Sequence, residues 1–75
     1  MEHYKNLGGN SGVYAYEISI DAIKVQFQDG AVYPYDYSAT GHDVVEQMKR
    51  YAIAGRGLNS YIKRFANKRY AARLK

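Results

Sequence analysis

The stretch Phe27-Gln28-Asp29-Gly30-Ala31-Val32-Tyr33-Pro34-Tyr35 has the pattern of a β-hairpin, and the rest of the chain can be arranged around its turn. Apolar and polar side chains alternate on both sides of Asp29-Gly30, which is the two-residue period of half-buried strands. Which side chains face each other across the two strands depends on the length of the loop.

Two loop lengths are compatible with this turn. A two-residue Asp-Gly loop would pair Phe27 with Val32 and split the two apolar sets between opposite faces of the sheet. A three-residue loop, a type I turn with Gly30 left-handed in a bulge, places both sets on one face. The three-residue loop is therefore preferred, and its facing pairs are Phe27 with Ala31, Val25 with Tyr33, and Ile23 with Tyr35.

Pro34 gives an independent check, because proline has no N–H group to donate to a neighbouring strand. In the three-residue register Pro34 lies opposite Lys24 at a non-hydrogen-bonded pair, where the missing N–H would point away from the partner strand. The strand that contains Pro34 is therefore expected at an edge of the sheet.

The composition indicates one small domain. The chain has 75 residues, no cysteine and a net charge of +4. At this length a domain buries only about 60% of the surface that its unfolded chain exposes. The lack of cysteine excludes disulfides and thiolate metal sites, and it fits a reducing cytoplasm. Since no apolar run approaches the roughly 18 residues of a spanning helix and no signal-peptide pattern occurs, we expect a soluble cytoplasmic protein.

The charges are divided along the chain. Residues 1–46 contain two lysines and seven acidic residues, a balance of −5, whereas residues 47–75 contain nine Lys/Arg and no acidic residue, a balance of +9. A basic block of this kind is typical of contact with phosphates, an anionic membrane or an acidic protein face. A solvated helix face with a basic tail is an equally ordinary interpretation.

The whole pattern predicts an α+β fold, a three-stranded antiparallel β-meander followed by two α-helices packed on one face. Residues 1–12 are polar and glycine-rich, so we expect a loosely ordered lead-in before a single domain at residues 13–75. The first strand is expected over residues 13–18, with one face formed by Tyr14, Tyr16 and Ile18.

Two helices are expected after Tyr37. Thr40 followed by Asp43 predicts the first N-cap, and Gly55 predicts a left-handed C-cap after Ala54. The apolar positions of this helix are Val44, Met48, Tyr51 and Ala52. A second helix should begin at Gly57 or Leu58, with an apolar stripe of Leu58, Tyr61, Ile62 and Phe65. Its last turns are expected to project or fray, because two arginines occupy positions that would continue the stripe, Arg69 and Arg73.

The basic end of the chain is the best candidate site, because closely spaced cations can neutralise several phosphates and release counterions. The nucleic-acid-binding residues predicted from it are Arg56, Lys63, Arg64, Lys68, Arg69 and Arg73. A possible phosphate-binding turn is formed by Gly55, Gly57 and Asn59. The alternative is a tight helix-to-helix turn in which the glycines permit the backbone angles and Asn59 caps the helix.

Other candidate residues have weaker support. Tyr33 and Tyr35 could form a stacking platform for bases, but the preferred register directs them into the core. His3 and His42 are far apart and have no carboxylate cluster around them, so no metal site is expected. No serine stands near a histidine in a nucleophile motif, and we expect no catalytic residue, no cofactor and no enzyme activity.

Four motifs occur in a characteristic order: Tyr16-Glu17, Val25-x-Phe27-x-x-Gly30, Tyr33-Pro34-Tyr35, and Ala52-Ile53-Ala54-Gly55-Arg56-Gly57-Leu58-Asn59 with Ile62. Over about residues 11–66 the chain thereby resembles the KTSC domain, found at the C-terminus of some lysyl-tRNA synthetases and as stand-alone bacterial and phage-type proteins. Glu17 replaces a usual aspartate, and Ser38-Ala39 stands where Val-Pro often occurs. The resemblance implies a three-stranded sheet with two helices.

Two functional hypotheses follow. The first is a non-catalytic nucleic-acid-binding accessory module, with RNA favoured by the synthetase-appended relatives, that places its basic C-terminal helix on backbone phosphates. The second is a small protein-interaction or phage-type inhibitor module that presents the exposed strand edge or the basic helix to an acidic protein partner. A membrane partner is not expected, because Arg69 and Arg73 interrupt the apolar stripe that interfacial insertion needs.

Overall fold

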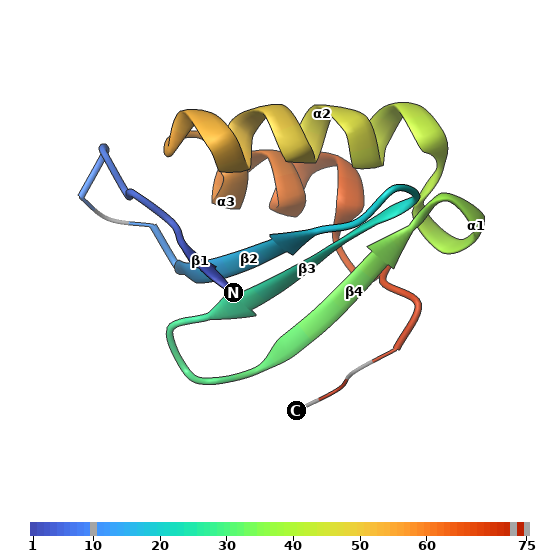
Figure 1. Cartoon of the computed structure of the whole chain (residues 1–75), viewed down its shortest axis with the longest axis horizontal. Helices are drawn as coiled ribbons and strands as arrows, with labels where there is room; N and C mark the ends of the chain where they lie inside the picture. Colours follow the sequence, from blue (N-terminus) through green and yellow to red (C-terminus); the bar gives the residue numbers. More distant parts are fainter. Residues whose placement is uncertain (10, 73, 75) are drawn as a thin grey trace.

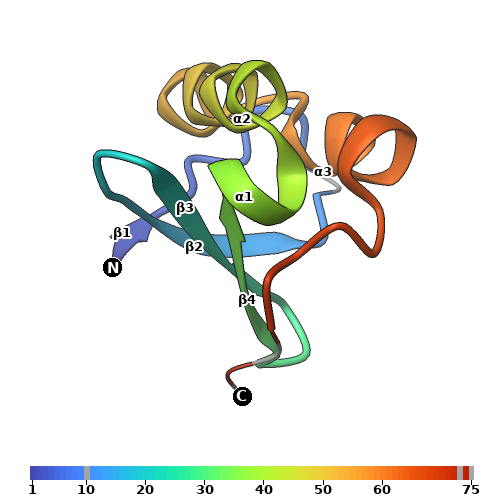
Figure 2. The same cartoon turned by 90° about the vertical axis from the view of Figure 1, so that its right-hand side faces the viewer.

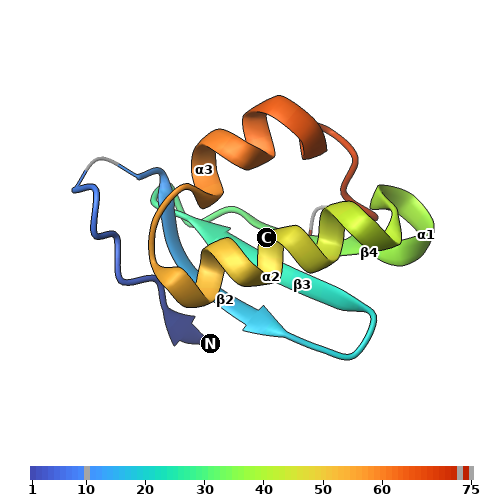
Figure 3. The same ribbon diagram turned by 90° about the horizontal axis from the view of Figure 1, so that it is seen from above.

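The computed structural model describes residues 1–9, 11–72 and 74. One antiparallel sheet has the strand order β1-β2-β3-β4 and is formed by β1 (Glu2–His3), β2 (Val13–Ile18), β3 (Ala22–Phe27) and β4 (Val32–Asp36). The helical elements are α1 (Tyr37–Thr40), α2 (His42–Ala54), α3 (Leu58–Tyr61) and, directly after it, a π-helical turn η1 (Ile62–Ala66). Helix α2 and the α3–η1 helix lie over the same face of the sheet (Figures 1 and 3). The expected α+β class is confirmed, but the sheet has four strands and not three.

The β3–β4 hairpin has the three-residue loop. The Phe27 N–H group donates to the Ala31 carbonyl at 2.9 Å, and Gly30, with φ of 92°, donates its N–H to the Phe27 carbonyl at 2.9 Å. The pairs observed between the strands include Val25 with Tyr33, Lys24 with Pro34, and Ile23 with Tyr35. The register derived from the apolar pattern is therefore confirmed.

The additional strand comes from the N-terminal segment. Glu2 pairs with Tyr16 and His3 with Ala15, and the following residue, Tyr4, is only 6% exposed. The Tyr4 hydroxyl accepts a hydrogen bond from the Leu58 N–H at 3.2 Å. The segment expected to be a loose lead-in thus supplies a strand and a core side chain. A two-residue strand has no periodicity of its own, so the sequence pattern did not indicate it.

Strand β2 has the predicted bounds but not the predicted face. The pairing with β3 shifts between Val13 and Ala15, which is a β-bulge. Because of the bulge, both Val13 and Tyr16 lie in the core, whereas Tyr14 is 42% exposed and contacts the His3 ring at 4.9 Å. Tyr14 is therefore not on the expected face, whereas Tyr16 and Ile18 share one and pair with Val25 and Ile23.

Helix α2 ends as expected and begins differently. Gly55 has φ of 79° and donates its N–H to the Tyr51 and Ala52 carbonyls, which closes the helix after Ala54. At the other end, the Asp36 carboxylate accepts the Ala39 N–H at 2.7 Å and caps the extra turn α1. The N-cap of α2 is consequently Gly41, not Thr40.

The second helix buries Leu58 and Ile62 of the expected stripe, but Ala66 and not Phe65 continues it. Its buried side chains are Leu58, Ile62 and Ala66, whereas Phe65 is 49% exposed. The wider winding of η1 places Ala66, four residues after Ile62, on the buried side and leaves Phe65 outward.

The chain reverses after Ala66 instead of continuing as a helix. Lys68 has φ of 63°, a left-handed conformation. The C-terminal tail, residues 67–72 and 74, then returns along the outer edge of β4 (Figure 2). Ala71 and Leu74 donate their N–H groups to the carbonyls of Pro34 and Val32, each at 2.8 Å. The expected projecting helix end is therefore wrong, and β4 is the last strand of the sheet with its edge covered.

Replacing Gly55 by alanine should destabilise the protein by about 1–3 kcal/mol. The left-handed φ disfavours any side chain, and a β-carbon at Gly55 would lie 2.6 Å from the Lys5 β-carbon, which cannot move without its backbone. Urea unfolding of Gly55→Ala measures the loss. Gly8→Ala is the matched control, because a β-carbon there meets nothing within 4 Å. Equal stability of the two variants would contradict the expected strain.

Candidate nucleic-acid interface

A groove of about 340 Å³ lies between the β3–β4 part of the sheet and the α3–η1 helix. Four of its lining residues are aromatic, one is aliphatic, two are amides and two are lysines. We call these residues the aromatic groove: Phe27, Tyr33, Tyr35, Tyr70, Ile62, Asn59, Asn67, Lys63 and Lys68. The groove therefore combines an apolar floor with hydrogen-bonding and cationic side chains.

The aromatic rings contact one another in series. The Tyr33 ring centroid lies 4.4 Å from that of Tyr70 and 5.8 Å from that of Phe27. Tyr70 also meets Tyr35 edge-on at 6.2 Å. Tyr35 is only 2% exposed and belongs to the core, as expected, whereas Tyr33 and Tyr70 are half-buried. Tyr33 and Tyr70, like Phe27 beside them, therefore combine partial exposure with a fixed orientation.

Tyr70 reaches the groove because the C-terminal tail is held on both sides of it. The fully buried Thr40 donates its hydroxyl to the Arg69 carbonyl at 2.6 Å. On the other side, the Ala71 N–H binds the Pro34 carbonyl of β4. The Arg69 guanidinium turns back and donates to the Phe65 carbonyl at 3.1 Å, at the C-terminal end of η1. These contacts fix the reversal that places Tyr70 against Tyr33.

Lys63 on η1 and Lys68 in the reversal both line the groove and are exposed. No acidic residue lines the groove with them. Among the described residues, the lysines that pair with carboxylates are Lys24 and Lys49, so the Lys63 and Lys68 ammonium groups are not held in an ion pair. The groove therefore has a positive side next to its aromatic floor.

The structure separates the other basic residues that the sequence placed on one helix. Lys68 and Arg69 lie beyond the helix end, which corrects their assignment to a helical face. Arg64 is exposed beside Phe65, with its guanidinium carbon 5.9 Å from the ring centroid, and does not line the groove. Arg56 is exposed in the turn between α2 and α3. Arg73 lies outside the described residues.

The turn at Gly55-Arg56-Gly57 is engaged in internal contacts. Gly55 and Gly57 are both left-handed, with φ of 79° and 83°. The Gly55 carbonyl accepts the Leu7 N–H at 2.7 Å, and the Leu58 N–H, which a phosphate would need, binds the Tyr4 hydroxyl. Asn59 makes no cap contact and lines the aromatic groove instead. These contacts favour the tight-turn interpretation over a phosphate-binding turn.

Sequence reasoning missed Tyr70, Asn67 and Phe27 as site residues. Tyr70 carried one signal, an aromatic side chain inside an otherwise basic segment. Its partner Tyr33 had been assigned to the core with Tyr35, because period-two alternation does not show how far the helices cover a strand.

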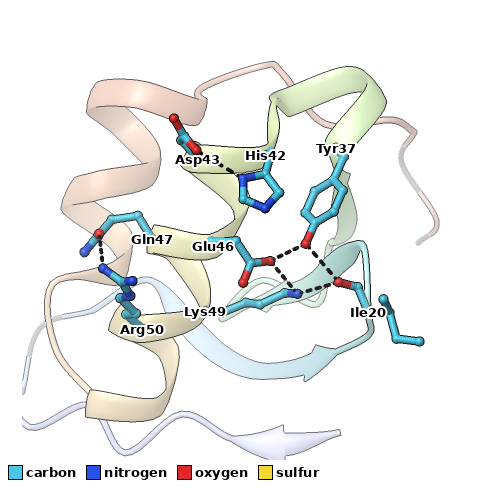
Figure 4. Close-up of polar contacts among 8 residues, drawn as sticks. All are labelled: Ile20, Tyr37, His42, Asp43, Glu46, Gln47, Lys49 and Arg50. Atoms are coloured by element: carbon cyan, nitrogen blue, oxygen red, sulfur yellow. Dashed lines mark hydrogen bonds and ion pairs between the residues drawn. The ribbon is translucent and has the colours of Figure 1, made fainter.

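A second polar cluster joins α2 to the turn between β2 and β3 (Figure 4). The Tyr37 hydroxyl lies 2.6 Å from the Glu46 carboxylate and 3.0 Å from the Ile20 carbonyl, and Lys49 contacts the same two groups at 2.7 and 2.9 Å. The hydrogen bond to Glu46 raises the pKa of Tyr37 to about 12, and hydrogen bonds from Lys49 and Tyr37 lower the pKa of Glu46. The groups satisfy one another, so the cluster serves as a structural clamp.

No protein-family model, curated protein or solved structure matches the chain. The resemblance to the KTSC domain therefore stays a prediction. Within residues 1–9, 11–72 and 74, no helix has the length and apolarity to cross a membrane. The same residues contain no group of three or more histidine or carboxylate side chains arranged to hold a metal ion.

Alkaline pH should destabilise the protein partly through Tyr35. Burial, with smaller effects of Tyr33 and Tyr70, raises the pKa of Tyr35 to about 12. An unfolded tyrosine ionises near pH 10, so the contribution of Tyr35 to stability is intact below about pH 10 and is lost as the pH rises toward about 12. Urea unfolding at stepwise pH should show a smaller alkaline loss for Tyr35→Phe than for wild type.

Tyr14→Phe serves as the control for this measurement, because the Tyr14 ring lies outside the core. Its alkaline loss of stability should equal that of wild type. A Tyr35→Phe profile that also parallels wild type would contradict the assigned role of Tyr35.

Proposed function

We propose that the protein is a non-catalytic module that binds single-stranded nucleic acid, RNA in the first place, in the aromatic groove. The main support for this proposal is that Lys63 and Lys68 lie beside the half-buried rings of Tyr33 and Tyr70. Aromatic faces accept any base and contribute about 1–3 kcal/mol per stacked base. Lysines beside the aromatic rings neutralise the backbone phosphates next to a stacked base. The preference for RNA rests on the resemblance to the synthetase-appended domain.

Single strands suit this groove better than a duplex. Base faces are hidden in a stacked duplex, and only an unpaired base can lie against a tyrosine ring. Asn59 and Asn67 add amide groups that both donate and accept hydrogen bonds. The edge of an unpaired base also has donors and acceptors, so the amides can bind it. The basic residues thus act together with aromatic and amide side chains, in place of one continuous basic helix.

A protein-interaction module with an acidic partner is the competing hypothesis. Strand addition to β4 would require the C-terminal tail to leave, because Ala71 and Leu74 occupy the carbonyls of Pro34 and Val32. An acidic protein partner would require only the positive charge of the two lysines and not the aromatic floor beside them. We therefore favour nucleic acid.

Binding to a fluorescein-labelled oligouridylate of about eight nucleotides should weaken as salt increases. For single strands the slope of log K against log salt is about −0.7 per neutralised phosphate, so Lys63→Ala and Lys68→Ala should each make the slope shallower by about 0.7. Fluorescence anisotropy at several salt concentrations measures it. Lys24→Ala is the charge-matched control, because Lys24 faces away from the helices and pairs with Glu17. The proposal would be refuted if the affinity did not depend on salt concentration. It would also be refuted if both lysine variants bound with the affinity and salt dependence of wild type.

The stacking part of the proposal has its own test. Tyr33→Leu should weaken binding by about 1–3 kcal/mol, while Tyr33→Phe, which keeps the ring, should bind within a few fold of wild type. Circular dichroism and urea unfolding establish that both variants are folded. Equal affinities of the Leu and Phe variants would show that the ring face is not used.

A further inference from the structure

A second set of aromatic side chains lies on the other side of the α3–η1 helix, toward α2. We call Tyr51, Tyr61 and Phe65 the aromatic row, since their ring centroids are 5.1 and 4.8 Å apart in that order. Phe65 is 49% exposed although smaller side chains of the same helix fill the core. The row borders a hollow of about 240 Å³ together with Gly57, Ser60 and Arg64. An exposed phenylalanine in line with two half-buried tyrosines beside a hollow is the kind of apolar patch that marks a binding surface.

Positive charge accompanies the aromatic row. Arg64 is exposed and lies over the Phe65 ring, with 5.9 Å from its guanidinium carbon to the ring centroid. Burial, with smaller effects of Tyr51 and Asp43, raises the pKa of Tyr61, and Arg69 opposes this shift. No acidic residue is among those that line the hollow beside the aromatic row. The charge next to Phe65 is cationic, as it is in the aromatic groove.

The aromatic groove and the aromatic row are connected around the start of α3. A polar hollow of about 200 Å³ lies between them and is lined by Asn6, Gly8, Ser11, Gly57, Asn59 and Ser60. Asn59 borders both this hollow and the groove, whereas Gly57 and Ser60 border both the hollow and the row. The three depressions therefore adjoin, aromatic at both ends and uncharged and polar in the middle.

We propose that one strand of nucleic acid occupies all three depressions, with bases stacked in the aromatic groove and on the aromatic row. Lys63 and Lys68 hold phosphates at one end and Arg64 at the other, and the sugar–phosphate backbone crosses Asn59 and Ser60 between them. Each end thus combines ring surfaces with cations, which complement the bases and the phosphates of a single strand. This inference rests on the function proposed above and adds that the site takes several nucleotides with two separable stacking positions.

The dependence of affinity on strand length tests this inference. Oligouridylates of about two to ten nucleotides are titrated into the full chain, with anisotropy as the readout. Phe65→Leu and Arg64→Ala should weaken the longest strands about tenfold and leave the shortest unchanged, because short strands fill only the aromatic groove. Tyr33→Leu should weaken strands of every length. Phe65→Tyr, which keeps a ring, and Ile53→Ala, another exposed apolar position, are the matched controls.

The possible failures are distinguishable. If Tyr33→Leu weakens binding but Phe65→Leu and Arg64→Ala leave the affinity of long strands unchanged, the second stacking position is wrong and the proposed function stands. If the shortest strands already bind with the highest affinity, the strand does not extend beyond the aromatic groove, and the proposed function again stands. If no strand of any length binds, the proposed function itself is refuted and this inference with it.

Discussion

The hydrogen bond from the Thr40 hydroxyl to the Arg69 carbonyl is the contact on which the proposed site depends. Thr40 is fully buried, so its hydroxyl needs a partner inside the protein, and leaving it unpaired would cost about 1–3 kcal/mol. The bond holds the chain reversal after η1, and the reversal brings Tyr70 against Tyr33. Without the reversal, Tyr70 and Lys68 would not line the aromatic groove with Tyr33.

The features that short-range patterns determine were predictable from the sequence. The β3–β4 register follows from the apolar alternation, from Gly30 in the loop and from the edge position that Pro34 requires, and the structure shows all three. The end of α2 at Gly55 is equally local, because one left-handed residue closes the helix. In these segments a few neighbouring residues carry the whole signal.

The features that long-range contacts determine were not predictable in this way. Tyr4 meets Leu58 across 54 positions of the chain, and Thr40 meets Arg69 across 29. Nothing near Tyr4 or Thr40 in the sequence identifies those partners. The basic residues near the C-terminus fit a helical period, but a left-handed Lys68 ends that period. The proposed site therefore takes Lys63 and Lys68 from the predicted basic segment, but these two lysines do not share one helix, and the sequence did not indicate that Tyr70 lies beside them.

The cover over β4 has a further consequence for the behaviour of the sheet in solution. The C-terminal tail donates N–H groups to β4 carbonyls, and Pro34 has no N–H to offer in return. A free edge strand is a template for aggregation, and natural sheets avoid this with proline, short strands or covering segments. Here the β4 edge has both proline and a cover, and the opposite edge is the two-residue β1. The residues of the tail that shape the proposed binding surface thus also discourage self-association through the sheet.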